Sequence, residues 1–60
     1  GGHPEVRKLA LYRGGVLATA MKEYDVGEAL LAQLVNLDEA YKDAADRLDK
    51  VRRMRHKEEP

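Results

Sequence analysis

The stretch EALLAQLVNLDEAYKDAADRLDKV, residues 28–51, decides the fold of this chain. Its apolar residues recur at alternating steps of four and three, the heptad spacing that keeps one stripe of a helix facing a partner. The residues with this spacing are Leu30, Leu34, Leu37, Tyr41, Ala44, Leu48 and Val51. Because no proline or glycine follows Gly27 before Pro60, the spacing predicts one long helix from about residue 26 to residue 55 or beyond.

An earlier helix is predicted over residues 4–24, where Pro4 suits the first helical position. One side of this helix is apolar, and Leu11 points away from that side. The apolar side consists of Val6, Leu9, Ala10, Val16, Leu17, Ala20, Met21 and Tyr24. Asp25 and Glu28 have the capping-box arrangement that begins a helix. The connection between the two helices is therefore short, which favours an antiparallel hairpin.

Two adjacent glycines, Gly14 and Gly15, lie inside the first predicted helix. Together they cost a helix about 2 kcal/mol relative to two alanines, so a break at this point would give three helices instead of two. The alternative is close packing, because Gly14 and Ala18 present a small-residue surface where another backbone can approach. The sequence leaves both interpretations open.

The chain has 60 residues, of which 43% are hydrophobic and 37% are charged, and this composition fits one small helical unit. Chains of this size bury only about 60% of their unfolded surface and need disulfides, a metal or association for stability. There is no cysteine, and the only histidines, His3 and His56, lie near opposite ends, so association is the expected remedy. We expect one module over residues 4–57, a disordered terminus or cloning remnant at 1–3 and a disordered tail at 58–60.

Charge is arranged in blocks along the chain. Residues 1–22 are mainly basic, residues 23–49 are mainly acidic and residues 50–57 are basic again, and the net charge is zero. The basic first helix is therefore expected to lie against the acidic part of the second. The final basic block raises the alternative of nucleic-acid binding through phosphate contacts. The neutral total and the absence of aromatic residues among the basic ones argue against that alternative.

Catalytic chemistry finds little support in the sequence. The chain has no serine, no cysteine and one threonine, and no histidine lies near that threonine in the helical pattern. The glycine pair lacks the surrounding pattern of a phosphate-binding loop. We therefore expect no enzyme activity and no catalytic, cofactor-binding or metal-binding residues. No apolar run approaches the roughly 20 residues of a membrane span, and the absence of cysteine fits a reducing compartment, so a soluble, intracellular protein is expected.

The sequence thus predicts an all-α fold: an antiparallel hairpin of two long helices, or three helices if the first breaks at the glycine pair. A helix over residues 26–55 is about 45 Å long and one over residues 4–24 is about 30 Å long, so neither can cover the other completely. Association into a helical bundle with coiled-coil packing would bury the remaining apolar residues. Leu34 and Leu37 are expected at the centre of the core.

These patterns favour a protein–protein interaction or oligomerisation module, such as an adaptor, within a larger protein. Its partner would be a second copy, giving a homodimer, or a helical segment of another protein. The alternative function is nucleic-acid binding through the basic block at residues 50–57. The residues expected in the interface or core are Leu9, Val16, Leu17, Leu30, Leu31, Leu34, Val35, Leu37, Tyr41, Leu48 and Val51. Arg13, Arg52 and Arg55 are candidates for polar contacts with an acidic partner.

Overall fold

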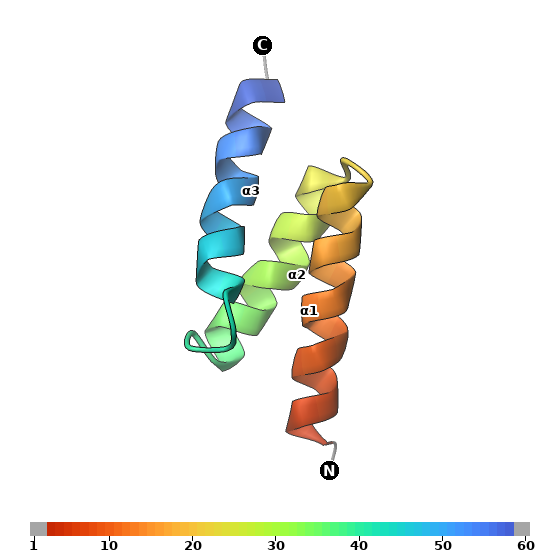
Figure 1. The fold of residues 1–60 in the computed structure, drawn as a ribbon, viewed down its shortest axis with the longest axis vertical. Helices are drawn as coiled ribbons and strands as arrows, with labels where there is room; N and C mark the ends of the chain where they lie inside the picture. Colours follow the sequence, from red (N-terminus) through yellow and green to blue (C-terminus); the bar gives the residue numbers. More distant parts are fainter. Residues whose placement is uncertain (1–2, 59–60) are drawn as a thin grey trace.

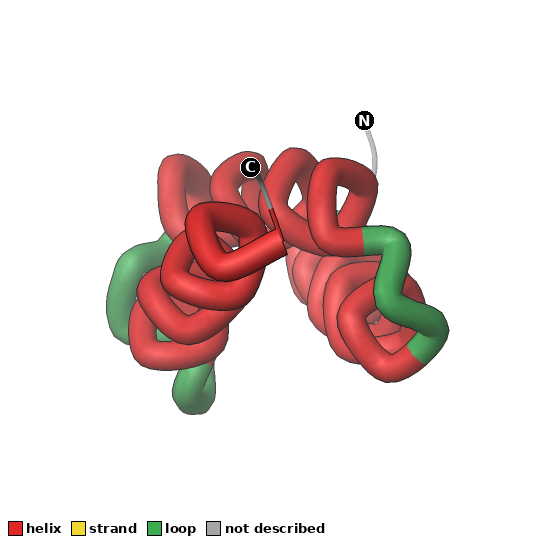
Figure 2. Tube along the Cα trace, turned by 90° about the horizontal axis from the view of Figure 1, so that it is seen from above, coloured by secondary structure: helices red, strands yellow, loops and turns green. Residues whose placement is uncertain are grey.

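The computed structural model describes residues 3–58, and this part of the chain forms three α-helices: α1 (Pro4–Ala20), α2 (Tyr24–Leu37) and α3 (Ala44–Glu58). α1 and α2 form an antiparallel hairpin, and α3 runs back along the other side of α2 (Figure 1). Both outer helices pack on α2 and barely touch each other, so the view from above is an arch with α2 at its top (Figure 2). The predicted all-α fold and its antiparallel hairpin are confirmed.

The predicted long second helix is wrong, because α2 ends at Leu37 and α3 begins at Ala44. Asp38 is extended, and its Oδ1 accepts a hydrogen bond from the Ala40 N–H at 3.1 Å. A side chain that bonds the backbone two residues ahead offers the chain an alternative to continuing the helix. Lys42 then adopts a φ of 43°, in the left-handed region, which turns the chain toward α3. The heptad stripe is therefore shared between two helices.

The end of α1 is a compact turn. The Glu23 N–H donates to the Ala18 oxygen at 2.8 Å, and the Lys22 N–H donates to the Thr19 oxygen at 3.0 Å. This pair of hydrogen bonds is the Schellman motif, whose left-handed position is usually glycine. Here that position is Lys22, with a φ of 65°. Because this motif ends the helix at Ala20, the predicted extension of the first helix to residue 24 is wrong.

The predicted capping box is also wrong. α2 begins at Tyr24 with Glu23 as its N-cap residue, and no side chain caps it. Asp25 therefore lies within the first turn, where a carboxylate still favours the positive end of the helix. Glu28 reaches α3 instead of turning back to the helix start.

The glycine pair does not break α1, and the helices do pack closely there, although the tightest approach is at Gly15 and not at the predicted Gly14. A Cβ atom at Gly15 would lie 2.7 Å from Leu31 Cγ, and one at Gly27 would lie 2.7 Å from Thr19 Oγ1 and 3.3 Å from the Gly15 oxygen. Glycines at these two positions let the backbones of α1 and α2 approach closely. The third helix arises from the break at residues 38–43, and not from Gly14.

The core follows α2. Leu31, Leu34 and Val51 are fully buried. One cluster joins all three helices through Leu11, Leu34 and Ala44, and a second joins α2 to α3 through Leu31, Leu48 and Val51. Dispersion contacts and removal of apolar surface from water at these positions stabilise the fold.

Leu37 is not at the centre of the core, because 49% of its surface is exposed. The predicted register assumed a continuous helix, and the helix ends at this residue. The predicted disorder at residues 1–2 and 59–60 lies outside the described residues. Within them, His3 directly precedes α1 and Glu58 is the last residue of α3.

Candidate protein-interaction surface

Large apolar side chains are exposed on α1, on α2 and at the turn between them, and none of those in the described part of the chain belongs to α3. We call these residues the hairpin face: Val6 (65% exposed), Leu17 (61%), Met21 (65%), Val26 (47%) and Leu37 (49%). At 100° per residue, Val6 and Leu17 lie about 20° apart on α1, and Val26 and Leu37 lie about 20° apart on α2. Met21 follows α1 at the turn. Each helix therefore contributes one apolar stripe.

Both stripes point away from α3. On α2, Glu28 faces α3, and Val26 and Leu37 lie about 160–180° around the helix from it. On α1, Tyr12 faces α3, and Leu17 lies about 140° around from it. The two stripes meet across the hairpin, where a Cβ atom at Gly14 would lie 3.1 Å from Leu30 Cδ1. The result is one continuous surface on the side of the hairpin that α3 leaves open.

This arrangement reverses what the sequence predicted for the first helix. Leu11, the residue expected to point away from the apolar side, is buried against Leu34 and Ala44. Leu17, on the side expected to pack on the second helix, is exposed. The reason is the crossing at Gly15, because α1 turns its smallest residues toward α2 and its larger apolar residues away.

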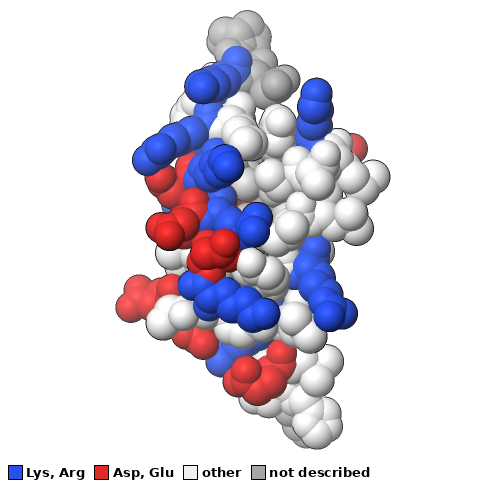
Figure 3. Space-filling view, in the orientation of Figure 1, with Lys and Arg blue, Asp and Glu red and all other residues white. Residues whose placement is uncertain are grey.

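Two arginines of α1 flank the hairpin face. Arg7 and Arg13 are exposed, and neither forms an ion pair with any described residue. By helical geometry they lie on opposite sides of the α1 stripe, about 120° apart. The one carboxylate of α1, on Glu5, lies 3.4 Å from Lys8. Most of the visible surface over α1 is uncharged, whereas charges of both signs crowd over α3 (Figure 3).

The basic residue of α1 that contacts Asp38 is Lys8 and not Arg13, with Lys8 Nζ 3.2 Å from Asp38 Oδ2. The hydrogen bond to Asp38 is the main reason that the pKa of Lys8 is raised above its ordinary value. Arg13 instead stays in solvent beside the apolar stripe.

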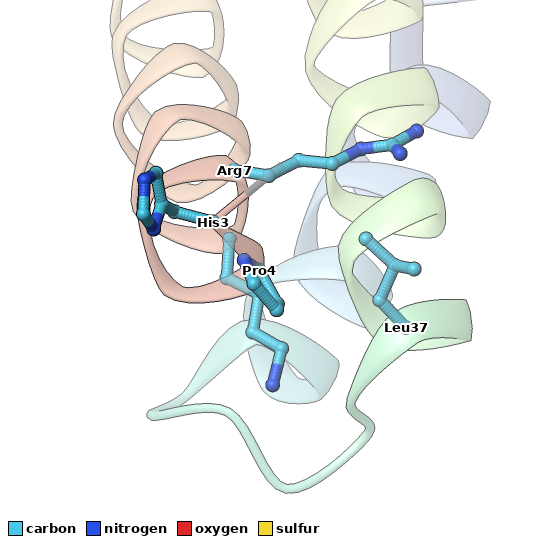
Figure 4. A pocket seen from close by; sticks show the side chains of 5 residues that line it. His3, Pro4, Arg7 and Leu37 are labelled. Carbon is cyan, nitrogen blue, oxygen red and sulfur yellow. The ribbon is translucent and has the colours of Figure 1, made fainter. Parts of the chain in front are cut away.

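A cavity of about 390 Å³ lies at one end of the hairpin face, between the start of α1 and the end of α2. It is lined by His3, Pro4, Arg7, Lys8 and Leu37. Figure 4 shows the Arg7 side chain extending from α1 toward α2, above Leu37. Leu37 belongs to the hairpin face and Arg7 flanks it, so the cavity is a continuation of that surface.

Polar contacts hold the start of α3 against α1. The Tyr12 hydroxyl donates to Asp43 Oδ1 at 2.6 Å, and Arg47 Nε donates to the Tyr12 oxygen at 3.1 Å and to Asp43 at 3.0 Å. The hydrogen bond that Tyr12 donates is the largest cause that lowers the pKa of Asp43. The hydrogen bond that the Tyr12 oxygen accepts is the largest cause that raises the pKa of Arg47. Lys42 Nζ lies 5.3 Å from the centre of the Tyr12 ring, within the range of a cation–π contact.

The end of α3 is held on α2 by Glu28. Arg52 Nε donates to Glu28 Oε2 at 3.0 Å, and Arg55 donates to Glu28 Oε1. The hydrogen bonds from Arg55 and then Arg52 lower the pKa of Glu28 below its ordinary value of 4.5. Arg53 Nη2 lies 2.6 Å from Asp49 Oδ2. Arg52 and Arg55, predicted to contact an acidic partner, therefore contact a carboxylate of their own chain.

The depressed pKa of Glu28 predicts a loss of stability in acid. Because the carboxylate is more acidic in the folded state than in the unfolded one, its stabilising effect is present above about pH 4.5 and is lost as the pH falls through the folded pKa. Glu28→Gln should lower the melting temperature at pH 7. It should also make the decline of the melting temperature between about pH 5 and about pH 3 shallower. Circular dichroism melts measure both effects.

Glu39→Gln is the matched control, because Glu39 is exposed and forms no ion pair with any described residue. Its melting temperature at pH 7 should equal that of the unchanged protein. Equal acid sensitivity of the unchanged protein and Glu28→Gln would mean that Glu28 does not hold α3.

The structure divides the residues predicted for the interface or core into three groups. The buried ones are Leu31, Leu34, Leu48 and Val51. The half-buried ones are Leu9, Val16, Leu30, Val35 and Tyr41. The exposed ones are Leu17 and Leu37. The sequence interpretation did not single out Val26 or Arg7, although Val26, Leu30, Gln33 and Leu37 follow a four-and-three spacing that indicates a second stripe on α2.

Comparisons with known proteins add no relative: no family model, no curated protein and no solved structure matches the chain. Within residues 3–58, no helix is both long enough and apolar enough to cross a membrane. The same residues contain no group of three or more His, Cys, Asp or Glu side chains that could hold a metal ion.

Proposed function

We propose that this protein is a protein–protein interaction module that docks a helix on the hairpin face. The observation that carries the proposal is the gathering of the large exposed apolar side chains on one side of α1 and α2. Burial of such side chains contributes about 25 cal/mol per Å² of apolar surface removed from water. A helix laid along the hairpin would cover both stripes at once and complete a four-helix arrangement.

α3 packs on the side of α2 opposite the hairpin face and leaves that face open. It buries Leu48 and Val51 against α2, and its polar contacts with Tyr12 and Glu28 fix it there. The charged outer surface of α3 favours water, so the helix presents no comparable apolar surface to a partner (Figure 3). The hairpin face is therefore the surface that best fits a docked helix.

The nucleic-acid alternative gains no support from the basic end of α3. Arg52, Arg53 and Arg55 all contact carboxylates of the same chain. Phosphate binding at these side chains would compete with those contacts. We therefore retain the interaction module as the proposed function.

Two measurements together test the proposal. Sedimentation equilibrium up to about 0.5 mM reports association with a second copy, and fluorescence anisotropy reports binding of labelled amphipathic helical peptides. We expect at least one of these to show association. Leu17→Glu should abolish it, because the substitution places a charge in the middle of the α1 stripe.

Ala45→Glu is the control, because Ala45 is exposed at the start of α3, away from the hairpin face. It should leave the association unchanged. A chain that is monomeric and binds no peptide contradicts the proposal. Association that survives in Leu17→Glu would contradict it as well.

A further inference from the structure

We infer that the occupant of the hairpin face is an acidic amphipathic helix of another protein, and not a second copy of this chain. The inference rests on the proposed function and adds the chemistry of the partner. It is carried by the two arginines beside the α1 stripe, by the cavity at Leu37 and by the symmetry that a pair of copies would require.

The arginines of this chain divide into two groups. Those of α3, Arg47, Arg52, Arg53 and Arg55, each contact a carboxylate of the chain. Those of α1, Arg7 and Arg13, have no such contact within residues 3–58. The guanidinium group binds carboxylates in a fixed, often bidentate geometry. The two arginines without a carboxylate are the ones that flank the exposed apolar stripe.

Among the described residues, no carboxylate forms an ion pair with either arginine. Glu5 pairs with Lys8, and Glu28 lies on the opposite side of α2. Glu23 and Asp25 lie at the turn, at the other end of α1 from Arg7. On α2, Gln33 lies between the positions of Val26 and Leu37 and carries no charge. The apolar stripe of α1 therefore has a positive border, which is complementary to a helix that is apolar with a negative border.

One way of pairing α1 with α1 of a second copy sets positive charge against positive charge. In a two-fold interface, residue i contacts residue j of the copy and j contacts i, so only a residue on the axis faces its own counterpart. If α1 packs antiparallel on α1 of the second copy so that Val6 faces Ala20, Arg13 falls on the axis and faces Arg13. Like charges in juxtaposition disfavour that complex, whereas an acidic helix removes the repulsion.

The spacing of the arginines describes the partner further. Arg7 and Arg13 are about 9 Å apart along α1 and lie on opposite sides of its stripe. The docked helix should carry carboxylates on both flanks of its apolar stripe, about six or seven residues apart. One of its large apolar side chains would enter the cavity beside Leu37. Arg7 also lines this cavity and would pair with a carboxylate of the docked helix next to that side chain. Apolar contact would supply the affinity, and the arginines would select and orient the partner.

The test uses three labelled helical peptides with the same leucine stripe and with glutamate, glutamine or lysine on both flanks. We expect the glutamate peptide to bind about tenfold more tightly than the glutamine peptide at low salt, and the lysine peptide to bind most weakly. The difference between the glutamate and glutamine peptides should shrink as salt rises. The double variant Arg7→Glu with Arg13→Glu should reverse the order of the peptides.

The control is Lys50→Glu with Lys57→Glu, which changes the net charge equally at exposed positions of α3. It should keep the preference for the glutamate peptide, and circular dichroism should show both double variants folded. Equal binding of the glutamate and glutamine peptides overturns the inference and leaves the proposed function standing. A dimer of this chain that the Leu17→Glu substitution dissociates would likewise overturn the inference and leave the proposed function standing. Binding to phosphatidylserine vesicles by a chain that is monomeric and binds no peptide would overturn both the inference and the proposed function.

Discussion

Leu34→Ala is expected to lower the free energy of unfolding by about 2–5 kcal/mol, most of the stability of so small a protein. Leu34 is fully buried and packs with Leu11 and Ala44 where all three helices meet. Removal of its side chain leaves a cavity at that junction, which the surrounding helices can fill only in part. Thermal unfolding followed by circular dichroism at about 222 nm measures the loss as a lower melting temperature.

Leu37→Ala is the matched control, three residues further along the same heptad pattern. Leu37 is 49% exposed and lies at the last residue of α2, so the same substitution should cost less than about 1 kcal/mol. Equal losses at the two positions would mean that the helix continues beyond Leu37 and that both leucines face the core.

Gly15→Ala should destabilise the protein by about 1–3 kcal/mol, even though alanine is the better helix former. The added methyl group would lie 2.7 Å from Cγ and 2.9 Å from Cδ2 of Leu31, a side chain that is itself fully buried. Relief of that overlap requires α1 and α2 to move apart along the hairpin. The measurement is again the melting temperature, with chemical denaturation as a second estimate of stability.

Substitution of the adjacent glycine, Gly14, is the control for Gly15→Ala. Gly14→Ala should be neutral or stabilising by up to about 1 kcal/mol, because its methyl group meets only the end of the flexible Leu30 side chain, at 3.1 Å. Stabilisation by both substitutions would contradict the close crossing of the two helices at Gly15.

The sequence predicted the helical class and the hairpin because apolar periodicity and the short connection are local features. The same reasoning missed the break at residues 38–43, although a signal for it is present. Asp43 directly precedes α3 and Asp46 lies in its first turn, where carboxylates favour the positive end of a helix. The unbroken heptad spacing hides that signal. The structure shows that the heptad spacing continues from one helix into the next across a turn.

The orientation of α1 could not be predicted from its own sequence. Periodicity identifies an apolar stripe but does not say which partner covers it, and here the larger stripe is left exposed. The deciding contacts are between Gly15, Gly27 and Leu31, which are distant in sequence and meet only in the folded hairpin. Leu17 and Arg13 were nevertheless named from sequence as interface candidates, and the structure places both on or beside the hairpin face.

The central position of α2 has a consequence for how quickly the protein folds. Nearly all of the contacts between helices join neighbours in sequence, because α1 and α3 barely touch. Chains dominated by such local contacts close short loops and fold in roughly microseconds to milliseconds. The few distant contacts, such as Tyr12 with Asp43, bring α3 to α1 and can form after the hairpin. A rapid-mixing or temperature-jump experiment on this chain would therefore follow two successive helix pairings, each nucleated around the same middle helix.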